Sequence, residues 1–236
     1  GRPHSLWYLG GNPSAGIANA GLNGVSMTAP TIGQINFTNP ASGNSYLARL
    51  QAQATQAGLL ILADRLWSNT LPAGTNVAQG ITSPVWPSRD ASGTTLGLGI
   101  YLGLEVLTAT GAGVPVITVA YTDELGNAGT ATNVDATVAS SAIGAFHRIG
   151  LASGDLGVRS VTSYQQSATW TSGTLALVAY RPLAALELTT PQVPNAIDAL
   201  TSGFPRLYDG SVPFLIFIPN TTTASYLSGM VSWAQG

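Results

Sequence analysis

The amino-acid sequence predicts a mainly β protein: an antiparallel β-sandwich or jelly-roll-like domain with an extended N-terminal arm and one short helix. Two stretches of alternating apolar and polar residues carry this prediction. Residues 166–180 alternate on both sides of a turn at Thr171–Gly173, the pattern of a β-hairpin with one buried face. Residues 116–121 form a similar run and lead into the polar turn Asp123–Asn127. The length of 236 residues suits one such domain, since sandwiches and barrels often contain about 200–250 residues.

Residues 1–44 are predicted to form the extended arm, and residues 45–236 the antiparallel β domain. The arm is rich in Gly, Asn, Pro and Ser, which interrupt regular structure at short intervals. Its apolar anchors are few, with Trp7, Tyr8 and Phe37 the aromatic ones, so we expect it to dock on a neighbouring subunit instead of forming core. On this interpretation, a chain that begins at residue 43 folds with a near-native melting temperature. The alternative is a disordered tail.

The short helix is predicted at the start of the β domain, over residues 46–57. Gly58 suits its end, and four apolar residues share one helical stripe: Leu47, Leu50, Ala54 and Ala57. The apolar run 59–67 could prolong this helix, but its shortness and the preceding glycine favour a buried strand. Within that run, Asp64 and Arg65 are expected to form ion pairs at a strand end or at an interface.

Glycines and prolines shape the middle of the chain. The Gly97-Leu98-Gly99 sequence lacks the third glycine and the lysine of nucleotide-binding loops, so we interpret it as a bend or a close approach of another backbone. Residues 100–107 follow as a strand that is buried on both faces for part of its length. A short similarity between residues 98–121 and 156–180 suits the doubled Greek key of a jelly roll. Trp86, which lies between prolines, is expected to cover the core, with a ligand groove as the alternative.

Three further elements are predicted near the C-terminus. Residues 195–200 could form one helical turn. Residues 214–218 form a strongly apolar strand, and residues 225–233 form the last strand.

Composition excludes several classes of partner. Only 8% of the residues are charged, against about 25% in a typical soluble domain. The eight basic residues are scattered arginines and the formal net charge is −2, so we expect no nucleic-acid partner and no anionic membrane. No run approaches the roughly 20 apolar residues that span a membrane, and no cysteine is present. A surface so poor in charge suits packing into a large assembly, or a neutral β protein of an extracellular type.

Catalytic motifs are absent from the sequence. No metal-ligand spacing and no Gly-x-Ser-x-Gly motif occurs, and His4 and His147 do not complete a convincing Ser-His-Asp set. We therefore expect no enzyme, no cofactor and no metal.

Four segments resemble a family of virion structural proteins of tailed bacteriophages. They are LILADRLWSN at 60–69, VWPSRD at 85–90, SATWTSG at 167–173 and DALTSGFPRLYD at 198–209, and the resemblance covers roughly residues 59–236. It implies a capsid decoration or cement protein that is made in the host cytoplasm and lies on the capsid surface of the virion. Its implied partners are the major capsid protein, bound non-covalently, and further copies of itself in a homotrimer.

The alternatives are a tail or neck component, and a carbohydrate-binding β-sandwich that uses Trp86, Trp170 or Trp233 as a stacking platform. Six residues are the candidate interface with partners: Trp7, Tyr8, Phe37, Arg65, Trp86 and Arg206.

Overall fold

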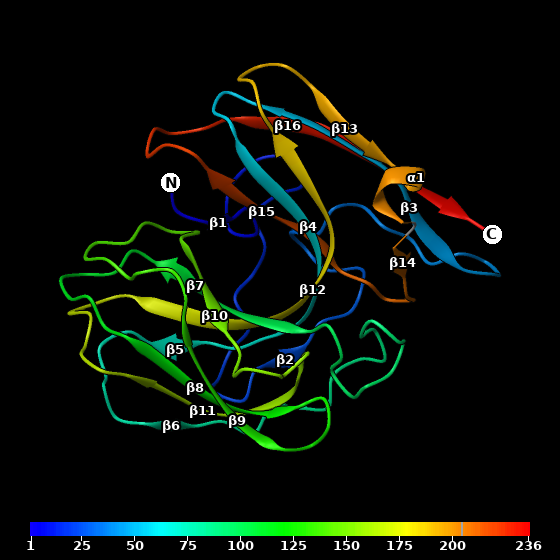
Figure 1. Ribbon diagram of the computed structural model, residues 1–236. Helices are drawn as coiled ribbons and strands as arrows, with labels where there is room; N and C mark the ends of the chain where they lie inside the picture. The colour runs from blue at the N-terminus through cyan, green and yellow to red at the C-terminus, as the bar shows by residue number, and fades with distance from the viewer. Residues whose placement is uncertain (204) are drawn as a thin grey trace.

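The computed structural model describes residues 1–203 and 205–236, and it is mainly β with one short helix. Twelve strands form a strongly curled antiparallel sheet, and four strands form a smaller one. The fold is thus of the β-sandwich or jelly-roll-like kind that the sequence predicts. In Figure 1 the smaller sheet lies at the top, and most strands of the larger sheet curl below it.

The larger sheet runs in the order β1-β15-β4-β12-β7-β10-β9-β8-β11-β6, with β2 beside β4 and β5 beside β12. Its strands are β1 (His4–Ser5), β2 (Val25–Ser26), β4 (Gly58–Ser68), β5 (Leu71–Pro72), β6 (Gln79–Gly80), β7 (Tyr101–Thr108), β8 (Ile117–Asp123), β9 (Ala128–Asn133), β10 (Phe146–Gly150), β11 (Val158–Gln166), β12 (Thr174–Leu188) and β15 (Pro213–Pro219). The long strands β4 and β12 run through both parts of the molecule.

The smaller sheet is centred on β3 (Ser45–Ala54). One edge of β3 pairs with β16 (Leu227–Gln235), and the other pairs with β13 (Asn195–Asp198) and β14 (Arg206–Leu207). Its apolar face packs against β4, β12 and β15, as in a sandwich. The residues that meet there include Leu47 and Leu50 of β3, Leu60 and Leu62 of β4, and Phe217 of β15.

The larger core lies inside the curled part of the sheet. It contains apolar residues of β4, β7, β8, β9, β10, β11 and β12, together with Trp86 and Trp170 from loops. Trp86 is 2% exposed and stacks on Trp67 with their ring centroids 6.5 Å apart, so it covers the core as the sequence predicts.

The strands predicted from apolar runs are confirmed. The run 59–67 forms β4, the run 100–107 forms most of β7, and the run 214–218 forms β15. The turn at Asp123–Asn127 joins β8 to β9 in a hairpin. The Asp123 carboxylate accepts the backbone N–H groups of Leu125 and Asn127, which fixes this turn.

The hairpin predicted over residues 166–180 is wrong. The strand β11 ends at Gln166 and pairs with β8 and β6, whereas β12 begins at Thr174 and pairs with β4, β5 and β7. The segment between them crosses from one strand environment to another, and Trp170 in it is buried with its indole N–H donated to the Val138 carbonyl. Alternation reports that one face is buried, but it does not identify the partner strand.

The helix predicted over residues 46–57 is also wrong, because this segment is β3. The register shows why: Ser232 of β16 lies opposite Arg49 while Trp233 lies opposite Leu47, so Ala48 is an extra residue in β3. Such a β-bulge shifts the alternation by one position. Leu47 and Leu50 therefore both point inward although they are three residues apart, and that spacing resembles a helical stripe.

The only helix of the described residues is α1 (Ala199–Ser202), which follows β13 directly. Residues 195–198 are thus strand and only residues 199–200 are helical, where the sequence predicts one helical turn over 195–200. The Asp198 carboxylate accepts the backbone N–H groups of Leu200 and Thr201, which caps the helix. A helix of four residues is too short to cross a membrane, and no other helix is present in residues 1–203 and 205–236.

The glycines at 97 and 157 mark a close approach of two backbones. Leu98 and Gly157 form a bridge, and Val158 donates its N–H to the Ile100 carbonyl at 3.1 Å. A Cβ at Gly97 would collide with the Val158 carbonyl. The close approach predicted from the glycines is thus confirmed, and the two similar segments of the sequence lie side by side.

Candidate interaction surface

The N-terminal arm lies on its own chain. Residues 1–44 are irregular, with several turns and bends, and contribute only the two-residue strands β1 and β2. The arm follows β15, since Leu6 donates its N–H to Leu215 at 2.9 Å and Ile35 donates to Pro213 at 2.8 Å. Three apolar side chains of the arm are buried in the cores of the same chain: Trp7, Met27 and Phe37. The arm therefore forms core here, which differs from the expectation that it buries little.

A fully buried ion pair lies beneath the arm. The Arg65 guanidinium donates two hydrogen bonds to the Glu105 carboxylate, at 2.8 and 2.6 Å, and both side chains have no exposed surface. Burial is the largest influence on the pKa of Arg65 and lowers it, but the charge and hydrogen bonds of Glu105, together with Tyr8, outweigh burial and raise that pKa. The Trp7 ring lies over the guanidinium, 4.6 Å from its carbon, so the arm shields this pair from water.

A second ion pair joins Asp64 to Arg89 at 3.1 Å. Arg89 also donates to the Met27 and Arg65 carbonyls at 2.9 and 3.0 Å, so it ties the arm to β4. The prediction that Asp64 and Arg65 form ion pairs is confirmed. Their position is corrected: both pairs lie in the interior, where unpaired charges are costly.

Most of the predicted interface residues are not on the surface. Trp7, Phe37, Arg65 and Trp86 are at most 4% exposed, so their own chain covers them. Tyr8 is partly buried beside Arg65. The structure thus brings Trp7, Tyr8 and Arg65 together as an interior cluster.

Arg206 alone among the six is exposed, and its guanidinium lies over the Tyr208 ring at 4.5 Å. Trp86 and Trp170 are buried, so neither ring is accessible as the stacking platform that the carbohydrate-binding alternative requires. Trp233 is partly buried and meets Phe37 edge-on, with the ring centroids 5.8 Å apart.

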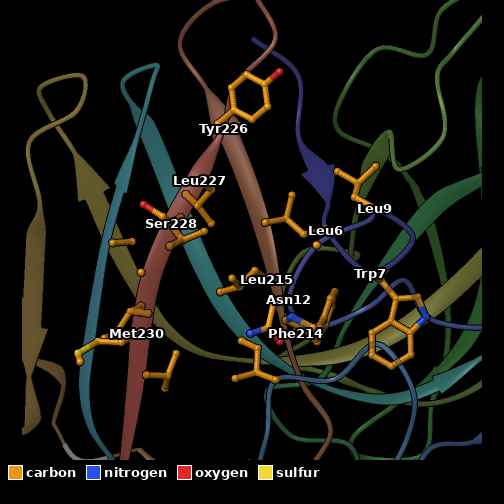
Figure 2. A pocket seen from close by; sticks show the side chains of 18 of the residues that line it. Leu6, Trp7, Leu9, Asn12, Phe214, Leu215, Tyr226, Leu227, Ser228 and Met230 are labelled. Carbon is orange, nitrogen blue, oxygen red and sulfur yellow. The ribbon is translucent and has the colours of Figure 1, made fainter.

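A groove with more apolar than polar surface lies between the arm and β16. It encloses about 330 Å³, and none of the residues that line it is charged. Figure 2 shows Leu6 and Leu9 of the arm across the groove from Leu227 of β16, whereas the Met230 side chain extends to the other side of that strand. We call this feature the β16 groove.

One edge of β16 carries backbone groups without a strand partner among the described residues. Just beyond the ends of β3, Thr55 donates to the Tyr226 carbonyl, and Asn44 exchanges two hydrogen bonds with Gly236. Even-numbered residues thus bond toward β3. Since backbone groups of successive residues point to opposite edges, five residues direct their N–H and C=O groups to the free edge: Leu227, Gly229, Val231, Trp233 and Gln235.

The β16 groove and this free edge were missed by the sequence analysis. The sequence feature that could have indicated them is a lack of charge, because no residue from 210 to 236 is charged. Natural edge strands are commonly protected by charges, prolines or a covering segment. The strand β16 contains neither charge nor proline, and its side chains are partly or fully exposed.

A second cavity of about 470 Å³ adjoins the N-terminus and is lined by Arg2 and His4 together with hydroxyl residues such as Ser141 and Thr221. Among residues 1–203 and 205–236, no three His, Cys, Asp or Glu side chains cluster closely enough to hold a metal ion.

Comparisons with protein-family models, with curated proteins and with solved structures found no similar family, protein or fold. The resemblance to virion structural proteins therefore rests on the four sequence segments alone.

Proposed function

We propose that this protein is a structural component of a larger assembly, and that it attaches through the free edge of β16 and the β16 groove. The observation that carries this proposal is an uncharged strand edge with unpaired backbone groups next to an apolar groove. Such an edge is a template for a further strand, and protein surfaces that stay in water usually block it. A partner that covers the edge satisfies the backbone groups and removes the apolar walls from water.

The assembly we favour is the head of a tailed phage, with the protein as a capsid decoration protein bound non-covalently to the major capsid protein. The support is the resemblance of the four segments, together with a chain of which only 8% is charged. Contacts that form only with the assembled shell stabilise that shell by mass action. No step of this function requires a reaction at the protein.

The direct test is the composition of purified virus particles that carry the gene for this chain. We expect mass spectrometry to find the chain at a fixed copy number per particle, and an electron-microscopy map to place it on the head surface. Density at the tail or neck would move the protein to that location within the virion. Absence of the chain from the particles would contradict the virion assignment.

A binding experiment tests the surface. Shells that lack the protein are incubated with the purified chain, and their melting temperature is measured. Met230→Lys adds a charge beside the free edge of β16, where Met230 is 57% exposed, and should reduce shell binding. Leu125→Lys is the matched control, because it adds the same charge at an exposed residue in the distant β8–β9 turn. If both variants bind the shells equally well, β16 is not part of the attachment surface.

A further inference from the structure

We propose that a second copy of this chain pairs with the free edge of β16, so that two β16 strands lie antiparallel across a two-fold axis at Val231. This inference rests on the proposed function: it assigns the free edge to the second copy and leaves the β16 groove to the shell. Two copies of the smaller sheet then join into one continuous sheet. The backbone, the side chains and the charges of β16 each support this occupant.

The backbone geometry allows a strand to pair with its own copy. With Val231 opposite Val231 of the second copy, Gly229 lies opposite Trp233 and Leu227 lies opposite Gln235. All five of these residues direct their backbone groups to the free edge. Each opposed pair can therefore exchange two N–H···O=C bonds, as hydrogen-bonded pairs of antiparallel strands do. A register shifted by one residue would place outward-pointing groups against groups that already bond to β3.

The side chains fit the same register. Leu227, Val231 and Trp233 face the sandwich interior and are only partly buried. In the paired arrangement the indole of Trp233 lies beside Gly229 of the other copy, which has no side chain to obstruct it. Aromatic residues opposite glycine and β-branched residues opposite each other are favourable cross-strand pairs. Pairing thus covers apolar surface that one copy leaves partly open.

Charge does not oppose the pairing. The nearest charged residue in the sheet is Arg49 of β3, opposite Ser232 and one strand from the edge. Its copy in the partner would lie three strand spacings away, about 14 Å. This separation exceeds the screening length of about 8 Å at physiological salt. A charged peptide, by contrast, would find no counter-charge in the β16 groove.

This symmetry predicts a dimer and replaces the homotrimer that the resemblance implies. A strand that pairs with its own copy forms an isologous contact, which closes after two subunits. A three-subunit ring needs two different surfaces to meet and cannot use β16 in this way.

The experiment is size-exclusion chromatography with light scattering on the full chain over a series of concentrations. We expect a species of twice the 24.1 kDa chain mass. Val231→Pro removes the N–H at the axis, and proline is tolerated where an edge N–H faces outward. This variant should raise the dimer dissociation constant at least tenfold, while Val231→Thr, which keeps the N–H, should not. Circular dichroism verifies that each variant folds.

A second pair of variants keeps the test valid if the proline variant unfolds. Met230→Lys and Met230→Glu each place like charges near the axis and should weaken their own dimers, less so in high salt. Mixed together, they should form a heterodimer. Leu125→Lys should dimerise like the unaltered chain.

Several outcomes would overturn the pairing: a monomer at all concentrations, a trimer, or a dimer that none of the β16 variants weakens. If the backbone amides of β16 become protected from hydrogen exchange only when shells are added, the pairing is also wrong and a shell segment is the occupant of the edge. A monomer that still binds shells leaves the proposed function intact. If the chain dimerises but is absent from virus particles, the proposed virion function is wrong and the pairing of β16 still stands.

Discussion

At the scale of single residues, the interior of this protein depends on charges that have no access to water. Arg65 and Glu105 are both fully buried, and Asp64 with Arg89 forms a second pair beside them. Two charges in such a place are tolerated because each satisfies the other. When one partner is removed, the other stays buried without a counter-charge, and the cost of keeping it out of water then destabilises the fold.

The Arg65–Glu105 pair gives the first prediction. Glu105→Ala leaves a buried guanidinium without its counter-charge and should lower the free energy of unfolding by about 3–5 kcal/mol. The double variant Arg65→Met/Glu105→Leu removes both charges and should be more stable than Glu105→Ala alone. Urea unfolding of the three proteins measures this. A double variant that is no more stable than Glu105→Ala would show that the pair does not act as a unit.

His147 gives a prediction for pH. It is 2% exposed and lies between the Trp170 ring, Asp135, Arg2 and His4, and burial lowers its pKa from 6.5 to about 4. The unfolded chain therefore binds a proton that the folded chain does not, as the pH falls from about 6.5 to 4. Stability should be complete above that window and decrease by roughly 3 kcal/mol across it.

The His147 measurement is urea unfolding between pH 7 and pH 4. The pKa of His4 is also lowered by burial, so this residue contributes with the same sign. His147→Gln should remove most of the pH dependence and leave the part due to His4. An unchanged slope in that variant would assign the effect to other groups.

At the scale of elements, the arm is the segment for which structure and sequence differ most. Its many glycines and prolines predict a segment without long strands, and residues 1–44 contain only the two short strands β1 and β2. Composition does not reveal what the few large side chains touch. Trp7 is 1% exposed and packs on Arg65 and Phe214, and Phe37 is 4% exposed.

These contacts favour an outcome opposite to the near-native melting expected for a chain that begins at residue 43. Removing residues 1–42 uncovers the Arg65–Glu105 pair and part of two cores, so we expect the shortened chain to unfold or to melt far below the full chain. Trp7→Ala alone should cost about 3–5 kcal/mol. A matched substitution, Ile17→Ala, removes an arm residue that is 62% exposed and should cost little. Calorimetry measures the melting of the shortened chain and of the two substituted chains. Unchanged melting of the shortened chain would support the original expectation that the arm docks on a neighbouring subunit.

The strand β3 shows a limit of periodicity as a predictor. Its burial alternates as in any half-buried strand, but the extra residue Ala48 places Leu47 and Leu50 on the same face. A bulge depends on the partner strand, which lies about 180 residues away in the sequence. The apolar runs of β4 and β15 were predicted correctly as strands, although the run 59–67 could also have prolonged the predicted helix.

At the scale of the whole molecule, local patterns predicted the fold class but not the pairing of distant strands. The β8–β9 hairpin is local, and its turn residues identify it. The partners of β12 are β4, β5 and β7, and nothing within residues 166–180 specifies them. The attachment surface is likewise a product of topology, because β16 becomes an edge only through the position of β3.

We propose above that partners attach at the free edge of β16. Hydrogen exchange resolved to single amides tests it most directly, first on the dilute chain and then on the assembled protein. If partners attach at this edge, five backbone amides should exchange fast in the dilute chain and become protected on assembly: those of Leu227, Gly229, Val231, Trp233 and Gln235. The even-numbered amides of β16 should be protected in both states. Unchanged exchange at these five amides, with protection elsewhere on the surface, would contradict the claim.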